Sequence, residues 1–127
     1  MSEDRQEGWS AVEDLAVFRR AYQLSLEVHR ISLSLPKVEQ WALGDQVRRA
    51  SKSICANLAE GFGRQGRFPA DFERFVVMAM GSADEMRVWT RYCRDLGYID
   101  PAQGDHWCQE YQEIAKMLAG LLRSRGR

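Results

Sequence analysis

The chain is poor in the residue types that build covalent links and metal sites. Its 127 residues include only 3 cysteines, 3 prolines and 2 histidines, and the cysteines (Cys55, Cys93 and Cys108) are odd in number and widely spaced. Such a set does not form a disulfide framework. No run of 18 apolar residues and no secretory signal pattern occurs. We therefore expect a protein of a reducing, cytoplasmic compartment with no membrane association.

The sequence also lacks an excess of one charge. Eighteen basic residues balance 18 acidic ones, which excludes a binder that depends on bulk positive charge. The balance is uneven along the chain: residues 1–15 carry one arginine against five acids, 1 − 5 = −4, and residues 44–67 carry five basic residues against two acids, 5 − 2 = +3. A basic segment of this size is common on solvated helices, and the alternative is that it contacts an anionic partner.

Residue patterns of common enzymes are missing as well. There is no Glu-x-x-His motif for a di-metal centre in a helical bundle, and His29 and His106 have no other ligands at suitable spacing. The glycine-rich segment 61–66 follows a helical pattern rather than a strand and has no lysine after its last glycine, so it differs from a phosphate-binding loop. We expect no catalytic residue, no metal and no cofactor, and hence a protein that is not an enzyme.

Helical periodicity is the dominant pattern that the sequence does contain. Apolar residues recur at spacings of three and four, which predicts helices over 13–35, 44–62, 69–96 and 101–124. Pro36 ends the first, glycines follow the second, and Pro69 and Pro101 begin the third and fourth. Short connections favour an all-α, antiparallel up-down-up-down four-helix bundle. It forms one domain over residues 13–127, preceded by a flexible acidic arm over 1–12.

The second predicted helix carries two polar features. One is a polar stripe at spacings of three and four: Gln46, Arg49, Ser53, Asn57 and Glu60. It suits a solvated face, a hydrogen-bonded helix contact, or a subunit interface or lumen. We expect Asn57 to satisfy polar groups at the helix end or between helices, and Glu60 to pair with an arginine of the same or a neighbouring subunit. The other is a basic face, which makes a candidate nucleic-acid-binding site: Arg48, Arg49, Lys52, Arg64 and Arg67.

Several aromatic residues do not follow the inward-facing series of their helices. They are Trp41, Trp89, Tyr92 and Tyr98. Tryptophan and tyrosine are typical anchors of protein interfaces, so these four are a candidate oligomer interface. The alternative is that a short bundle simply places large aromatic residues at its ends.

Residues 46–64, QVRRASKSICANLAEGFGR, resemble the signature segment of the 23S ribosomal RNA intervening-sequence proteins. The motif positions are Gln46, Ser53, Asn57, Glu60 and Gly61. Flanking matches extend the resemblance over about residues 13–122: Leu15–Phe18 with Ala21-Tyr22, Leu35-Pro36 with Glu39, Gly81–Glu85 and Leu96–Ile99. Gly44 departs from the Thr or Ser cap that the family often has there.

This resemblance implies a four-helix bundle that assembles into a homopentamer, in a bacterial family whose biochemical role is poorly defined. A related branch, the accessory variability proteins of diversity-generating retroelements, binds nucleic acid and a reverse transcriptase. The resemblance therefore implies structured RNA, or a reverse-transcriptase-like or other ribonucleoprotein partner, bound by the basic face of the second helix. The alternative is a purely protein-binding adaptor with no nucleic-acid role.

Overall fold

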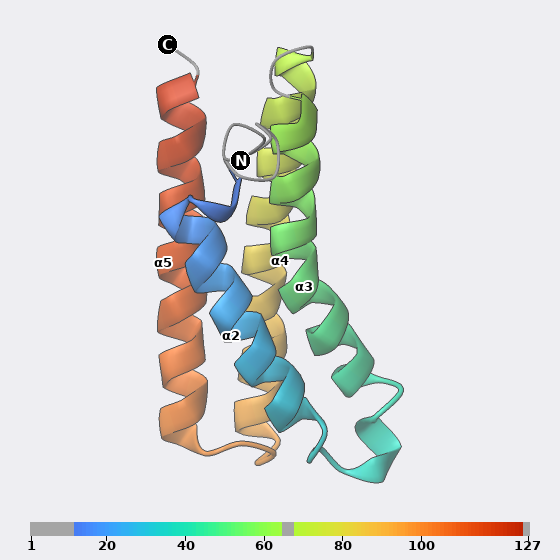
Figure 1. Cartoon of the computed structure of the whole chain (residues 1–127). Coiled ribbons are helices and arrows are strands. Elements are labelled where there is room, and N and C mark those ends of the chain that lie inside the picture. Colours follow the sequence, from blue (N-terminus) through green and yellow to red (C-terminus); the bar gives the residue numbers. More distant parts are fainter. Residues whose placement is uncertain (1–11, 65–67, 126–127) are drawn as a thin grey trace.

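Four long helices lie side by side in the structure, a computed structural model that describes residues 12–64 and 68–125. They are α2 (Ala16–Ser32), α3 (Leu43–Arg64), α4 (Pro69–Asp95) and α5 (Pro101–Arg125), and a short 3-10 helix, η2 (Lys37–Glu39), joins α2 to α3. Successive helices run in opposite directions (Figure 1). The described residues contain no strand, and the predicted all-α up-down-up-down bundle is confirmed.

The bounds of the predicted helices differ from those observed mainly in the first helix. Residues 33–35 were expected to be helical, but their backbone N–H groups bond three residues back, as in Leu33 N–H to Arg30 O (3.3 Å) and Leu35 N–H to Ser32 O (3.1 Å). The chain therefore leaves α2 through tightened turns ahead of Pro36. Residues 1–11 of the predicted arm lie outside the described residues, and Val12, its last residue, is buried in the core.

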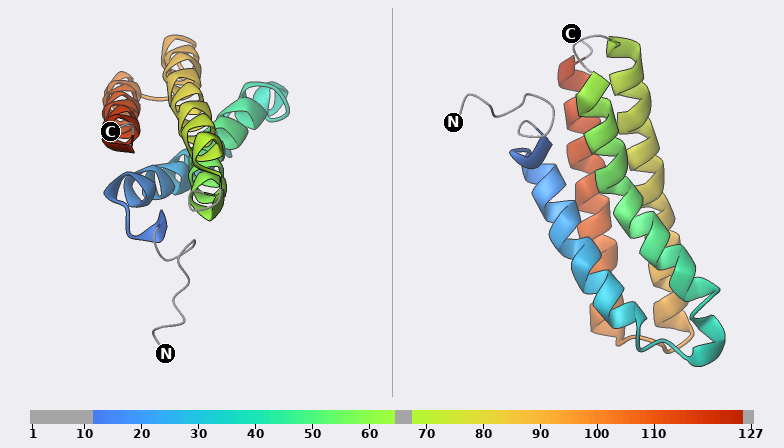
Figure 2. Two further views of the ribbon diagram at one scale, coloured as in Figure 1. Left: turned by 90° about the horizontal axis from the view of Figure 1, so that it is seen from above. Right: turned by 45° about the vertical axis from the view of Figure 1, so that its right-hand side comes forward.

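The core runs along the bundle axis between all four helices (Figure 2). Its largest fully buried side chains include Ile54, Phe72, Met86, Trp107 and Tyr111. The indole N–H of Trp107 donates to Glu27 Oε2 at 2.9 Å, which satisfies a polar group that burial would otherwise leave unpaired. None of the described helices is both long enough and apolar enough to cross a membrane.

Two glycines allow helices to approach closely. A Cβ on Gly61 of α3 would lie 3.1 Å from Phe75 Cβ, and a Cβ on Gly104 of α5 would lie 2.8 Å from Arg94 Cβ. The aliphatic part of Arg94 therefore packs against α5 at Gly104, in the space that a larger side chain at this position would occupy. This crossing brings the Arg94 guanidinium to Asp105, at 2.9 Å.

Candidate nucleic-acid interface

Arg48 occupies the corner where α2, η2 and α3 meet. Its Nη1 donates to Ser32 Oγ at 2.8 Å and its Nη2 to the Gln40 carbonyl oxygen at 2.6 Å. Both acceptors are neutral, so these bonds hold the guanidinium in place without cancelling its charge. Arg48 thus ties the α2–α3 connection to α3 and leaves a fixed positive charge at that corner.

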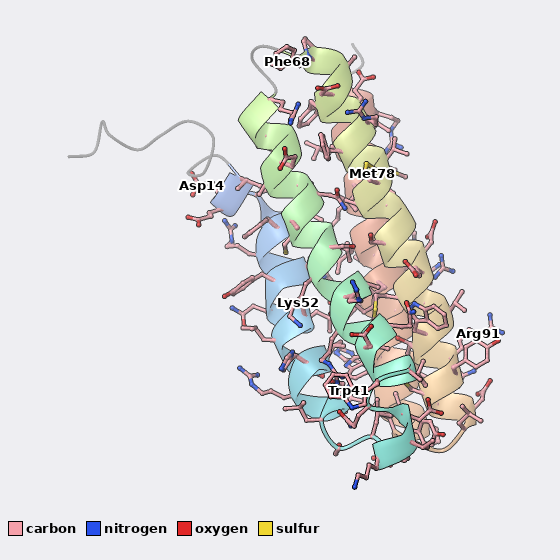
Figure 3. All side chains as sticks on the ribbon, turned by 90° about the vertical axis from the view of Figure 1, so that its right-hand side faces the viewer. Asp14, Trp41, Lys52, Phe68, Met78 and Arg91 are labelled. Atoms are coloured by element: carbon pink, nitrogen blue, oxygen red, sulfur yellow. The ribbon has the colours of Figure 1, made fainter. Side chains whose placement is uncertain are left out.

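Lys52 lies one turn further along α3 and faces α2 (Figure 3). Its Nζ is 2.9 Å from His29 Nδ1 and donates to the Arg48 carbonyl oxygen at 3.3 Å. The ammonium charge of Lys52 is the largest cause that lowers the pKa of His29, followed by burial and by the charges of Arg48 and Arg30. Burial and the charge of Arg48 lower the pKa of Lys52. His29 is therefore surrounded by cations from two helices.

We call His29, Arg30, Arg48 and Lys52 the α2–α3 cationic cluster. Among the described residues, neither the two arginines nor the lysine forms an ion pair with a carboxylate. An uncompensated group of cations at a surface is a favourable place for an anion. His29 and Arg30 were missed in the sequence because they lie on a different helix from the basic face; their position in the last turn of α2 was the available signal.

The other predicted basic residues are paired or distant. Arg49 is exposed and pairs with Asp45 of its own helix at 3.1 Å. Arg64 pairs with Glu60 at 3.0 Å and with Asp71 of α4 at 3.1 Å. It lies 16 residues beyond Arg48, or about 24 Å along the helix, so the predicted basic residues do not form one patch. Arg67 lies outside the described residues.

The polar stripe of α3 follows the seam between α3 and α4. Ser53 Oγ and Ser82 Oγ form a hydrogen bond across the seam, and Asn57 Nδ2 donates to the Ser53 carbonyl oxygen at 2.9 Å. Glu60 pairs with Arg64 within the same chain, while Gln46 is exposed at the other end of the stripe. Within one chain, only Ser53 of the stripe hydrogen-bonds to α4, and Asn57, which was expected to satisfy helix-end or interhelical polar groups, bonds to a carbonyl of its own helix. The ends of the stripe are exposed.

Three of the four predicted interface aromatics share one pocket at the end of the α3–α4 seam. Trp41, Trp89 and Tyr92 line it, together with Gln46, around a cavity of about 360 Å³; we call it the Trp41 pocket. The Trp41 side chain is strongly exposed, at 88%. Tyr98 lies outside the pocket and donates its hydroxyl hydrogen to Glu39 Oε2 at 2.8 Å.

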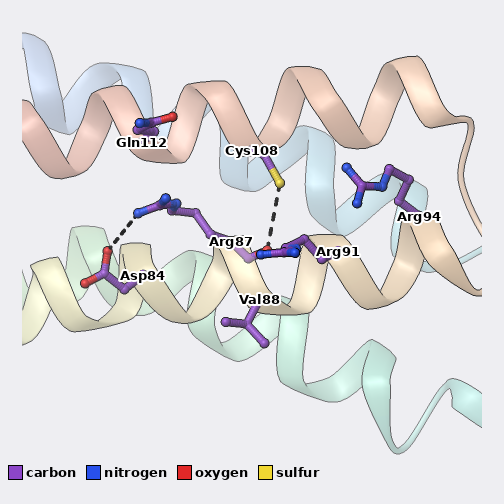
Figure 4. A pocket seen from close by; sticks show the side chains of 7 residues that line it. All are labelled: Asp84, Arg87, Val88, Arg91, Arg94, Cys108 and Gln112. Atoms are coloured by element: carbon purple, nitrogen blue, oxygen red, sulfur yellow. Dashed lines mark hydrogen bonds and ion pairs between the residues drawn. The ribbon is translucent and has the colours of Figure 1, made fainter.

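A second cationic region lies between α4 and α5, where three arginines of α4 border a cavity of about 490 Å³ (Figure 4). Arg87 pairs with Asp84 at 3.5 Å, and Arg94 pairs with Asp95 and Asp105, each at 2.9 Å. Arg91 is the arginine of this groove without an ion pair among the described residues. Because carboxylates compensate most of its charge, this groove is the weaker of the two candidate anion sites.

Within the described part of the chain, neither the two most buried cysteines nor the metal-ligating residue types meet the requirements of a nucleophilic or a metal site. Burial raises the pKa of the Cys55 thiol to about 12, and burial together with the charge of Glu39 raises that of Cys93 to about 11. Both thiols are therefore protonated and weakly nucleophilic at neutral pH. No group of three His, Cys, Asp or Glu side chains within residues 12–64 and 68–125 is arranged to hold a metal ion.

Comparison with known proteins agrees with this architecture. The model of the family described as 23S rRNA-intervening sequence protein matches residues 13–120. A crystal structure of a protein of unknown function from the S23 ribosomal protein family of Bacteroides thetaiotaomicron is similar in fold, with a TM-score of 0.75 and 23% sequence identity over 84% of this chain and 95% of that one. No curated protein matches. Since the match spans most of the bundle and includes the segment with the polar stripe, the chain belongs to the 23S rRNA-intervening sequence protein family.

Proposed function

We propose that the protein is a non-enzymatic, homo-oligomeric scaffold that binds structured RNA, alone or within a ribonucleoprotein, through the α2–α3 cationic cluster. The observation that carries this proposal is a set of cations at one corner of the bundle that have no carboxylate partner among the described residues, in a chain whose net charge is zero. Phosphate groups of RNA would supply the missing negative charge, and the release of their counterions would favour binding.

Self-association is proposed to use the outer face of α4. Val77, Met78, Val88, Tyr92 and Leu96 are each about half exposed there, although they are large apolar residues. They recur along one helix, and an extended apolar face of this kind is typical of a protein interface. The homopentamer that the family resemblance implies is the expected assembly, and it would carry five copies of the cationic cluster.

The RNA site is tested with the double charge reversal R30E/K52E. Equilibrium binding of a fluorescent RNA hairpin is measured at several salt concentrations, with K116E/R123E as the matched control, since both of its residues are exposed on α5. We expect R30E/K52E to lower affinity at least tenfold and to reduce the slope of log K against log salt by roughly 1.5–2, two phosphate contacts having been lost. Equal affinities of the two double variants would refute the site.

Binding through this cluster is also expected to depend on pH. The charge of the neighbouring Lys52 lowers the pKa of His29, and a phosphate bound beside the two side chains would raise it. RNA binding would then take up a proton, so affinity should increase as the pH falls from 8 to about 6. His29→Gln should flatten this dependence, whereas a flat profile of the wild-type protein would place the RNA elsewhere.

A protein-binding adaptor without RNA is the alternative, and the exposed apolar face of α4 favours it. The double variant V77K/V88K is expected to shift the mass measured by light scattering toward the monomer, with Val38→Lys on η2, an exposed valine outside this face, as the control. An unchanged mass would exclude this face as the contact between copies. Wild-type protein that binds no RNA at low salt would favour the adaptor.

A further inference from the structure

We propose that the Trp41 pocket receives the base of an unpaired nucleotide from the RNA whose phosphates bind the α2–α3 cationic cluster. This inference rests on the proposed function and narrows it: the ligand is a loop, bulge or single-stranded segment rather than an uninterrupted duplex. Such segments are recognised by cations that bind the backbone together with aromatic side chains that stack on the bases. Both elements lie near the connection between α2 and α3.

The turn that presents Trp41 is held firmly by side-chain hydrogen bonds. Gln40, its neighbour, accepts from Arg48 at 2.6 Å through its carbonyl oxygen, and donates from Nε2 to the carbonyl oxygens of Ser32 (3.0 Å) and Leu35 (2.9 Å). These bonds join the turn to both α2 and α3. The backbone that carries Trp41 is therefore fixed, so little backbone flexibility remains to be lost when a ligand contacts the indole, which is 88% exposed.

A second anchor holds the same turn from the side of α4. Glu39 Oε2 accepts the hydroxyl hydrogen of Tyr98 at 2.8 Å, and Glu39 Oε1 accepts the backbone N–H of Leu43 at 3.3 Å. Tyr98 follows α4, so the turn is tied to a third helix. The residues around Trp41 are thus ordered by their own contacts, which leaves the aromatic surface available to a ligand.

The pocket has the size and chemistry that a nucleobase requires. Its cavity of about 360 Å³ is lined by the side chains of Trp41, Trp89 and Tyr92 on its aromatic side. Gln46 adds an amide, which both donates and accepts hydrogen bonds and so can pair with the edge of a base. Stacking on aromatic side chains tolerates any base, since every base has a π face.

The pocket and the cationic cluster lie on opposite sides of the same turns of α3, separated by roughly one helix diameter, or about 10–12 Å. Arg48 bonds to the residue next to Trp41, and Lys52 lies one turn further along the helix. Figure 3 shows Lys52 above Trp41 on the face turned to the viewer. The outer surface of α3 between them carries Arg49, which pairs with Asp45, and a strand that runs from the cluster to the pocket would cross this surface.

A second copy of this chain is the competing occupant, because Tyr92 and Leu96 belong to both the pocket and the apolar face of α4. The cations favour RNA: a second copy of this chain has no net charge, whereas an RNA strand carries a negative charge at every phosphate and is attracted to Arg48 and Lys52. A nucleic-acid strand supplies both the base and the phosphates in one molecule. The experiment must therefore separate RNA affinity from assembly.

The test compares Trp41→Ala with the wild-type protein on two fluorescent probes, a single-stranded oligouridine of ten nucleotides and an RNA duplex of similar length. Light scattering records the mass of each variant. Val38→Ala is the matched control, since Val38 is 81% exposed on the same connection and lies outside the pocket. Loss of one stacked base is expected to lower the single-strand affinity of Trp41→Ala by roughly 5- to 100-fold. Trp41→Phe should restore most of it, and the duplex affinity and the mass should not change.

Each other outcome overturns the inference. Single-strand affinity of Trp41→Ala equal to that of Val38→Ala would show that no base stacks on the indole. Equal losses on both probes would show that Trp41 acts through the phosphate site rather than through a base. A reduced mass with unchanged RNA affinity would assign the pocket to contact between copies. R30E/K52E separates the two proposals, since it should weaken both probes, and a wild-type protein that binds neither probe would overturn the proposed function together with the inference.

Discussion

The contact between α4 and α5 at Gly104 leads to a quantitative prediction for Gly104→Ala. The added Cβ would lie 2.8, 2.9 and 3.0 Å from Cβ, Cγ and Cδ of Arg94. Carbon atoms pack best at about 3.5–4.0 Å, so the helix or the arginine must move by roughly 0.5–1 Å. Overpacking of this kind costs about 1–3 kcal/mol. The higher helix propensity of alanine returns at most about 1 kcal/mol, so the free energy of unfolding should fall by about 1–2 kcal/mol.

Gly81→Ala is the matched control, because Gly81 also lies within a helix but has no atom within 4 Å of the position of an added Cβ. Here only the helix propensity changes, and we expect a gain of about 0.5–1 kcal/mol. Thermal melts should move by about 3–8 °C downward for Gly104→Ala and by about 2–4 °C upward for Gly81→Ala. The melts are recorded at two protein concentrations, since association makes Tm depend on concentration. A Tm of Gly104→Ala at or above that of the wild type would refute the close approach.

Three further measurements test other parts of the bundle. Glu110 accepts two hydrogen bonds from Arg20, which are the largest cause that lowers the pKa of Glu110 below 4.5; the stability from this pair is therefore present above about pH 4.5 and is lost as the pH falls through the lowered pKa. Glu110→Gln should lower the free energy of unfolding by about 0.5–1 kcal/mol at pH 7. It should also reduce the fall of that free energy at acid pH, measured by urea denaturation at a series of pH values, and an unchanged fall would refute the role of the pair. Glu27→Ala should lower the free energy of unfolding by about 1–3 kcal/mol, because it leaves the indole N–H of the buried Trp107 unpaired. Glu27→Gln keeps an acceptor and should lower it less. Equal losses of the two variants in chemical denaturation would argue against the hydrogen bond. Cys55 and Cys93 should react with iodoacetamide at pH 8 at least tenfold more slowly in the native protein than in urea, because burial keeps their thiols protonated; equal rates, followed by mass spectrometry, would show that the core opens readily.

The order of the helices could be predicted from the sequence because an apolar pattern marks each helix and a proline marks the start of two of them. Apolar residues at spacings of three and four give the helical face, and Pro69 and Pro101 each stand at the first residue of a helix, as predicted. The end of α2 was placed three residues too late. Leu35 continues the apolar pattern and is buried, so the pattern could not reveal that the backbone around it had already changed from α-helix to tighter turns.

The candidate site was less accessible to sequence reasoning, because charge is compensated between helices. Arg48 and Arg49 are neighbours with the same charge, yet the first bonds to neutral oxygens at a corner of the bundle and the second pairs with Asp45. Arg64 finds a partner in Asp71, which belongs to the next helix. The packing of the helices determines which cations remain without a carboxylate partner. It also determines that His29 lies beside them.

The hydrogen bond between Ser53 and Ser82 has a consequence for the alignment of α3 and α4 along their axes. Gln46 and Trp89, which line the Trp41 pocket, each lie seven residues from this serine pair toward one end of the bundle. The ion pair of Arg64 with Asp71 lies eleven residues from it toward the other end, again on both helices. All three pairs therefore share one antiparallel register. If α4 slid by one turn along α3, the hydrogen bond between the two serines, the ion pair of Arg64 with Asp71 and the Trp41 pocket would be lost together. The serine hydroxyl groups at the middle of the seam therefore help to fix the register of the two helices at both ends of the molecule.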